Sequence, residues 1–291
     1  MFPSFLIGLR EGLEAALIVA ILVAYLVKTS NGHALKRLWL GVGAAIGVSV
    51  ALGLVMTFIS EELSEEAAEA FAGITSLLAV GLITWMIFWM ATNARHIKAH
   101  LHGEMDRALE TSTVAVAMVA FLAVVREGLE TAIFLWAGIR SSGEATTAVI
   151  GAILGLATAV VLGFLMYKGA VKLNLTALFT WTGALLVIVA GGILRYAVHE
   201  FQEVGWLPGE DNVAFDLTST FPADGVIATF ARGLLSITPS MTWLEVVVWL
   251  AYVIPTLIAF FWVISRRSAP KPAAPSDAPA AADAAADASS R

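Results

Sequence analysis

The chain has 291 residues, of which 59% are hydrophobic and 14% are charged, and its mean hydropathy is +0.84. This composition is too apolar for a soluble globular domain and indicates a polytopic membrane protein. Cysteine is absent, which excludes disulfides, iron–sulfur clusters and thiolate metal sites. The sequence also shows no nucleotide-binding loop, nucleophile triad or nucleic-acid-binding patch.

Seven apolar segments are each long enough to cross a bilayer as a helix, which takes about 20 residues. The sequence therefore predicts an all-α fold of seven transmembrane helices in one permease domain over residues 1–265. We expect the spans near residues 3–27, 38–59, 71–91, 113–138, 145–167, 176–198 and 243–264.

Basic residues are concentrated in alternate connections between these spans. The first connection carries Lys28, Lys36 and Arg37, and the chain after the last span opens with Arg266 and Arg267. The second connection carries only acidic residues. Since Lys and Arg collect on the cytoplasmic side, the pattern predicts the N-terminus outside and the C-terminus inside.

One five-residue motif occurs twice, each time in the middle of an apolar span. Arg10-Glu11-Gly12-Leu13-Glu14 in the first span returns as Arg126-Glu127-Gly128-Leu129-Glu130 in the fourth. On a helix the two glutamates of each copy lie three residues apart and share a face, with the arginine beside them. Ionisable residues inside a membrane are expensive and usually functional.

The duplicated motif predicts an inverted repeat of helices 1–3 and 4–6, with helix 7 outside it, because helices 1 and 4 cross in opposite directions. Two further alignments favour the repeat. Gly43 to Gly47 in helix 2 aligns with Gly151 to Gly155 in helix 5. In the third and sixth helices, glycines match at one common offset: Gly73 with Gly183, and Gly81 with Gly191.

Four carboxylates brought together in a low-dielectric site would repel one another unless a cation lay between them. Hard multivalent cations prefer such oxygen ligands. The sequence therefore predicts a metal site made by Glu11, Glu14, Glu127 and Glu130, in which Arg10 and Arg126 form supporting ion pairs. The alternative is that each motif is only an intrahelical ion pair, but that leaves Glu11 and Glu127 without partners.

Two other groups of side chains lie toward the predicted outer side. His199, Glu200 and Glu203 at the end of the sixth span are candidates for a secondary metal site, or for a polar helix end in which they pair with neighbours. The second connection carries a row of acids that would either concentrate cations at a pore mouth or simply form a solvated surface. These acids are Glu61, Glu62, Glu65, Glu66 and Glu69.

Two segments complete the organisation of the chain. Residues 224–237, in the long sixth connection, have the pattern of an amphipathic helix lying on the outer surface. Residues 266–291 are rich in Ala, Pro and Asp and predict a disordered cytoplasmic tail.

With its doubled Arg-Glu-x-x-Glu motif, the chain resembles the iron permease family, which includes the high-affinity iron permeases of fungi and the EfeU-type permeases of bacteria. Phe88-Trp89-Met90 and the stretch from Tyr196 to Glu203 are also similar to bacterial members. The resemblance covers about residues 1–265. It implies a multi-pass protein of the bacterial cytoplasmic membrane whose motif glutamates bind iron.

The resemblance also implies a separate extracytoplasmic oxidase or peroxidase and a periplasmic iron-binding protein as partners. We therefore expect a permease, not an enzyme, that moves Fe²⁺ or Fe³⁺ inward through a midplane glutamate site. Iron would be its transported substrate, with no organic cofactor and no nucleic-acid partner. The alternatives are a membrane-embedded carboxylate di-metal oxidoreductase and a transporter of another divalent cation such as Mn²⁺. The residues leave the oligomeric state open.

Overall fold

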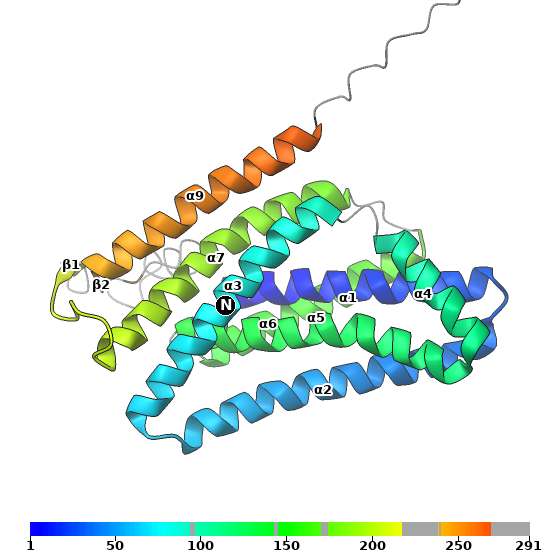
Figure 1. The fold of residues 1–291 in the computed structure, drawn as a ribbon, viewed down its shortest axis with the longest axis horizontal. Coiled ribbons are helices and arrows are strands. Elements are labelled where there is room, and N and C mark those ends of the chain that lie inside the picture. Colours follow the sequence, from blue (N-terminus) through cyan, green and yellow to red (C-terminus); the bar gives the residue numbers. More distant parts are fainter. Residues whose placement is uncertain (94–96, 143–144, 170–173, 217–237, 239, 269–291) are drawn as a thin grey trace, which may run out of the picture.

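The computed structural model describes residues 1–93, 97–142, 145–169, 174–216, 238 and 240–268. In this part of the chain, α-helices pack side by side, and a two-stranded antiparallel sheet precedes the last helix (Figure 1). The helices are α1 (Phe2–Lys28), η1 (Gly32–Ala34), α2 (Leu35–Glu62), α3 (Glu65–Asn93), α4 (Ile97–Thr111), α5 (Thr113–Ser142), α6 (Ala145–Tyr167), α7 (Leu175–Glu203) and α9 (Trp243–Ser268). The strands are β1 (Val213–Asp216) and β2 (Ser240–Thr242).

The helices have the lengths and compositions of a polytopic membrane protein, which confirms the predicted class. Among the described residues, five segments are long and apolar enough to cross a membrane: Gly32–Glu62, Glu65–Thr92, Ala145–Tyr167, Thr176–Glu203 and Trp243–Arg266. With 27 and 30 residues, α1 and α5 also exceed the bilayer requirement. Each carries the three charged residues of a motif at its centre, whereas each of the other five contains an 18-residue stretch with at most two charged residues. Each predicted segment falls within one helix.

The fourth helix, α4, is short and lies outside the predicted spans. It has 15 residues and a mixed composition, and it packs on α5 and α1 through Leu101, Met105 and Ala108. The hydroxyl of Tyr25 at the end of α1 donates a hydrogen bond to Asp106 of α4. These contacts attach α4 to the ends of the two helices that carry the motifs.

Each of the first three long helices packs mainly on one of the later helices α5, α6 and α7. The first helix α1 packs mainly on α6, α2 mainly on α5, and α3 on α7, while α1 and α5 also meet each other. Figure 1 shows α2 along one edge of the bundle and α9 along the opposite edge, with the other long helices between them. The motif helices therefore occupy the interior.

Small residues allow the motif helices to approach their partners closely. A Cβ added at Gly12 of α1 would lie 2.8 Å from the Cβ of Ala159 on α6, and one added at Gly128 of α5 would collide with Ser49 on α2. Such close approach is typical of glycine at membrane helix interfaces. Ala16, one turn further along α1, meets Gly163 of α6 in the same interface.

The glycine alignment predicted between the second and fifth spans, α2 and α6, does not correspond to like packing contacts. Gly43 and Gly47 have no atom within 4 Å of an added Cβ, whereas Gly151 and Gly155 press against the backbone of α1 at Met1 and Phe5. The residue of α2 that plays the part of Gly151 is Gly41, which presses against Ala117 of α5. Ala117 follows Met1 in the sequence by the same number of residues as Gly128 follows Gly12, so Ala117 and Met1 are equivalent positions in the two copies. Glycine spacing alone could not distinguish the packed glycines from those on the outer face.

The glycine match between the third and sixth spans, α3 and α7, corresponds to like packing at one of its two pairs. An added Cβ at Gly73 would meet the ring of Phe201, and one at Gly183 would meet the ring of Phe260. The other pair differs. Gly191 of α7 contacts Val253 and Trp249 of α9, but Gly81 of α3 has no neighbour within 4 Å of an added Cβ. The difference arises because α9 covers α7, while α3 has fewer contacts with α9. The predicted surface helix at residues 224–237 and the tail beyond Ser268 lie outside the described residues.

Candidate metal centre

The two motifs meet in the interior, where α1 packs against α5. Glu11 and Arg10 are fully buried, and Glu14, Glu127 and Glu130 are nearly so. Both helices continue through the motif without interruption because Arg, Glu and Leu are good helix formers and Gly12 and Gly128 each sit against a neighbouring helix. Each pair of glutamates therefore projects from one helix face into the same region.

Three of the four motif carboxylates gather closely enough to share one ion. Glu11, Glu14 and Glu127 each offer an oxygen within 4.8 Å of the other two. Glu130 lies close enough to interact electrostatically with all three. Negative charges at such separations in a low-dielectric interior repel strongly, and a bound cation would remove that repulsion.

The arginines make the same contact in both copies. Arg10 Nε donates to Glu14 Oε1 at 3.1 Å, and Arg126 Nε donates to Glu130 Oε1 at 3.1 Å. These pairs account for the second glutamate of each motif. Among the residues that the structure describes, they leave both carboxylate oxygens of Glu11 buried without a hydrogen-bond partner. A buried carboxylate in that condition is strongly unfavourable, and coordination of a cation would satisfy it.

The surroundings of the two arginines differ. The Arg10 side chain is only 1% exposed, and its Nη1 has no hydrogen-bond partner. The Arg126 side chain is 40% exposed and lies over two rings of α3, with its Cζ 4.8 Å from the centroid of Trp89 and 5.4 Å from that of Trp85. The carboxylate group is therefore more open on the Arg126 side than on the Arg10 side.

The histidine near the C-terminal end of α7 lies between two carboxylates. His199 Nδ1 is 3.1 Å from Glu245 Oε1 on α9, and Nε2 is 3.4 Å from Glu203 Oε1 one turn along α7. Glu200, the third predicted member, is buried, and its carboxyl lies beside the hydroxyl of Tyr196. The structure thus brings His199 and Glu203 into contact, while Glu200 lies beside Tyr196.

The predicted single row of acids does not exist, because the helix breaks between Glu62 and Glu65. Leu63 is extended, with φ −76° and ψ 155°, so two of the acids end α2 and three begin α3. Glu69 is the least exposed of the five and is an electrostatic neighbour of Glu203 on α7. Glu69 of the predicted acidic group therefore adjoins the pair of His199 and Glu203. The acids are Glu61, Glu62, Glu65, Glu66 and Glu69.

Glu245 was missed by sequence reasoning. It is buried in the first turn of α9, where it accepts a hydrogen bond from Arg195 Nη1 at 3.2 Å and one from the Thr242 backbone N–H at 2.8 Å. An acidic residue at the start of an apolar span is usually interpreted as an interfacial residue. Ionisable residues within spans are rare and usually paired, so Glu245 and Arg195 considered together could have indicated the pair.

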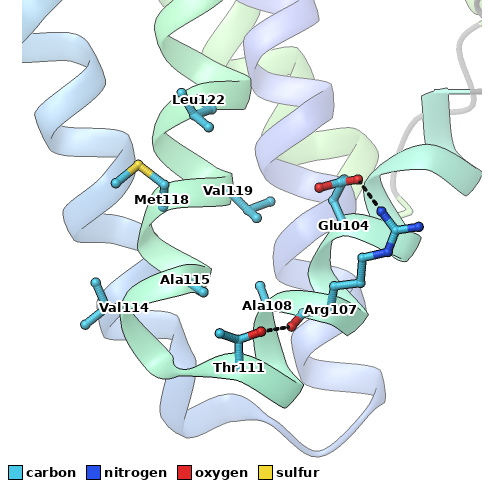
Figure 2. Close-up of a pocket in the computed structure, with 9 residues that line it drawn as sticks. All are labelled: Glu104, Arg107, Ala108, Thr111, Val114, Ala115, Met118, Val119 and Leu122. Atoms are coloured by element: carbon cyan, nitrogen blue, oxygen red, sulfur yellow. Dashed lines mark hydrogen bonds and ion pairs between the residues drawn. The ribbon is translucent and has the colours of Figure 1, made fainter.

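A groove on the surface between α4 and α5 is separate from these groups (Figure 2). It has a volume of about 430 Å³, and none of the motif residues lines it. Its wall on α5 is apolar, with Val114, Met118 and Leu122, and its rim on α4 carries the exposed ion pair of Arg107 and Glu104 at 3.3 Å. An apolar wall of this kind suits a lipid-facing surface.

The chain is similar to known iron transporters over almost its whole length. The model of the iron permease FTR1 family matches residues 1–265. The ferrous iron permease EfeU of Escherichia coli O6:H1 is 39% identical over 263 residues, which cover 89% of this chain and 95% of that protein. EfeU of Yersinia pestis is 39% identical over 265 residues, covering 90% and 93% of the two chains.

No solved structure matches the chain. The family match and the relatives agree with the resemblance predicted from the doubled motif, and the names of the relatives describe transporters and not enzymes. The membrane-spanning helices agree with that activity. The chain therefore belongs to the iron permease FTR1 family and is a multi-pass iron permease of the bacterial cytoplasmic membrane.

Proposed function

We propose that Glu11, Glu14, Glu127 and Glu130 form the site through which iron crosses the membrane. The observation that carries this proposal is the carboxylate of Glu11, which is buried without a hydrogen-bond partner and has oxygens of Glu14 and Glu127 within 4.8 Å. Oxygen ligands of this number and charge suit a hard or borderline multivalent cation. Arg10 and Arg126 hold Glu14 and Glu130 and limit the net negative charge.

Ferrous iron is the proposed substrate, because the curated relatives are named ferrous iron permeases. The same site with a fixed di-metal centre would serve an oxidoreductase. Such sites normally use Glu-x-x-His motifs, and neither copy has a histidine three residues after a glutamate. Any oxidase, peroxidase or periplasmic iron-binding protein would be a separate chain, as the family resemblance implies.

The proposed membrane arrangement has seven spans, α1, α2, α3, α5, α6, α7 and α9, with the N-terminus outside and α4 on the cytoplasmic side. The alternation of basic and acidic connections supports it. The exchanged helix pairing supports an inverted repeat of α1–α3 and α5–α7, because α1 on α6 and α5 on α2 are the two equivalent contacts that such a repeat requires. The family match ends at residue 265, which supports a permease domain over 1–265 and a tail over 266–291 outside it.

The direct test is uptake of radioactive iron into proteoliposomes that contain the purified protein. We expect uptake of Fe²⁺ kept reduced by ascorbate, competition by excess Mn²⁺ that is weaker than competition by unlabelled Fe²⁺, and little competition by Mg²⁺. Uptake no faster than in protein-free liposomes would refute iron transport by this chain alone. Equal competition by Mg²⁺ would refute a site selective for iron.

A further inference from the structure

The outer end of α7 places an imidazole nitrogen and a carboxylate at the spacing of two ligands on one metal ion. His199 Nε2 and Glu203 Oε1 are 3.4 Å apart, and both side chains are partly exposed, at 43% and 38%. Two ligand atoms that are each about 2.1 Å from a metal in tetrahedral or octahedral geometry stand roughly 3.0–3.4 Å apart. The observed separation is long for a strong hydrogen bond and suits a shared ion.

The other nitrogen of His199 is held by a fixed carboxylate. Nδ1 is 3.1 Å from Glu245 Oε1, and the Glu245 side chain is only 2% exposed. That carboxylate also accepts hydrogen bonds from Arg195 and from the backbone of Thr242, so it links α7 to α9 and has little freedom to move. When the neutral imidazole donates its Nδ1 proton to Glu245, Nε2 keeps its lone pair and points toward Glu203.

A buried carboxylate behind a metal-binding histidine is a common arrangement, because it fixes the tautomer and makes the imidazole a stronger ligand. The alternative is that His199 is protonated and forms ion pairs with both carboxylates. That arrangement would need no metal. Acidic neighbours of Glu203, among them Glu69 of α3 and Glu200, make the surroundings negative and favour a cation in either case.

We propose that His199 and Glu203 form a second metal site at the outer end of α7 that binds a divalent first-row transition metal, with Glu245 as the positioning residue. The position of this site on the path of the ion, before the midplane carboxylates, rests on the proposed function. Its chemistry differs from theirs, since imidazole binds Fe²⁺, Mn²⁺, Co²⁺ and Zn²⁺ but not Mg²⁺ or Ca²⁺ to any extent. With two protein ligands and water in the remaining positions, the site binds weakly and releases its ion readily.

A selective first site gives the transporter a distinction that oxygen ligands alone do not provide. Mg²⁺ and Ca²⁺ bind carboxylates well, so the motif glutamates would admit them wherever these ions are abundant. An ion that must first bind at His199 is selected for its affinity for nitrogen. The acids at the start of α3, including Glu69, would raise the local concentration of all cations, and His199 would choose among them.

The test measures metal binding and not transport, so that it is independent of the midplane site. The background protein carries Glu11→Gln and Glu127→Gln, and Co²⁺ serves as the probe because its visible absorption reports its ligands. We expect the detergent-purified background protein to bind one Co²⁺, which Mn²⁺ and Zn²⁺ displace and a large excess of Ca²⁺ does not. His199→Gln or Glu203→Gln should weaken Co²⁺ binding at least about tenfold.

His100→Gln provides the matched control, because His100 is an exposed histidine on α4. It should leave Co²⁺ binding unchanged. Glu245→Gln should weaken Co²⁺ binding by roughly 10- to 100-fold while the bound spectrum keeps its nitrogen-ligand character, which a merely structural role would not produce. Size-exclusion profiles and Tm values identify any variant that fails to fold, in which case Glu203→Gln alone decides the result.

Three results would overturn the second site: no Co²⁺ binding by the background protein, unchanged Co²⁺ binding in His199→Gln, or displacement of Co²⁺ by Ca²⁺ as effectively as by Mn²⁺. Failure here is distinguishable from failure of the proposed function. Co²⁺ binding at His199 can be lost while the unmodified glutamates still transport iron, and iron uptake can be absent while the outer site still binds Co²⁺.

Discussion

Glu11 differs from the other motif glutamates in having neither an arginine partner nor exposure to solvent. In a helix bundle surrounded by lipid, such a carboxylate has no structural use that an apolar side chain would not serve better. Glu127 is its counterpart in the second motif, and an oxygen of each lies within 4.8 Å of the other. The carboxylates of the two motifs therefore lie in one group, as the proposed site requires.

Glu11→Gln and Glu127→Gln test whether the two motifs act as a unit. Each substitution keeps side-chain volume and removes one ligand charge, so each should reduce iron uptake about tenfold or more, which corresponds to about 1.4 kcal/mol. The double variant should be scarcely worse than either single variant, because residues that act together are non-additive. Proteoliposome uptake at matched protein amounts measures this, with the exposed Glu110→Gln on α4 as control. Near-normal uptake by the well-folded double variant would contradict the midplane site.

The arginines should differ in their effect on stability although their motifs are identical in sequence. Arg10→Gln leaves Glu14 as an unpaired charge in a fully buried setting, which costs about 3–5 kcal/mol when a buried pair loses one partner. Arg126 is 40% exposed and lies over the rings of Trp85 and Trp89, so Glu130 is less enclosed than Glu14 and Arg126→Gln should cost less than Arg10→Gln. Thermal unfolding of the purified proteins should show a clearly lower Tm for Arg10→Gln. Equal Tm values for the two variants would mean that the two halves have like environments.

This asymmetry marks a limit of what the sequence could predict. The motifs themselves were predictable, because charges within apolar spans stand out by their cost. The positions of the two arginines were not predictable. Arg126 lies over Trp85 and Trp89 and Arg10 is enclosed because of packing between helices that are distant in sequence, and two identical pentapeptides do not encode that packing. Glu245 was missed for a similar reason, since its partner Arg195 lies 50 residues away and on another helix.

At the level of helices, the long helices and their approximate bounds followed from apolar length, since the bilayer fixes how long a span must be. The short helix α4 and the two strands did not follow from it. The register between helices did not follow. Gly43 and Gly41 are both glycines of α2 two positions apart, yet only Gly41 touches α5. Glycines on the lipid side and the packed side of a helix look alike in the sequence, so only side-chain contacts separate them.

Gly12→Leu and Gly43→Leu test the difference between a packed glycine and one on an open helix face. Gly12 lies within van der Waals distance of Ala159 and Leu156 on α6, so a leucine there must push α1 away from its main partner. Overpacking of this kind typically costs about 1–3 kcal/mol, and the shift would also separate Glu11 from Glu127. We expect Gly12→Leu to lower both Tm and iron uptake, whereas Gly43→Leu leaves both nearly unchanged because its site is open.

The result for Gly43→Leu decides the register as well as the packing. If Gly43→Leu were as harmful as Gly12→Leu, Gly43 would have to lie in a helix interface, and the correspondence of Gly41 with Gly151 would be wrong. If neither variant had an effect, the close contact of α1 with α6 would not contribute to stability or to the carboxylate site.

At the level of the whole molecule, the exchanged pairing of α1 with α6 and α5 with α2 places the motif helices side by side in the interior. With the inverted repeat and the outside N-terminus proposed above, the two helices run in opposite directions through the membrane, so Arg10 would lie on the outer side of Glu11 and Arg126 on the inner side of Glu127. The buried Arg10 and the exposed Arg126 then correspond to a bundle that is closed toward the outside at the motif and more open toward the cytoplasm.

That assignment of sides depends on the N-terminus lying outside, and the absence of cysteine makes it directly testable. A single cysteine can be introduced without background labelling, at Ser64 between α2 and α3 or at His33 between α1 and α2, both of which are exposed. A membrane-impermeant maleimide added to spheroplasts should label Ser64→Cys at once and His33→Cys only after the membrane is permeabilised. Iron uptake by both variants verifies that they are folded. Labelling of His33→Cys alone in sealed spheroplasts would reverse the orientation, and the buried Arg10 would then face the cytoplasm.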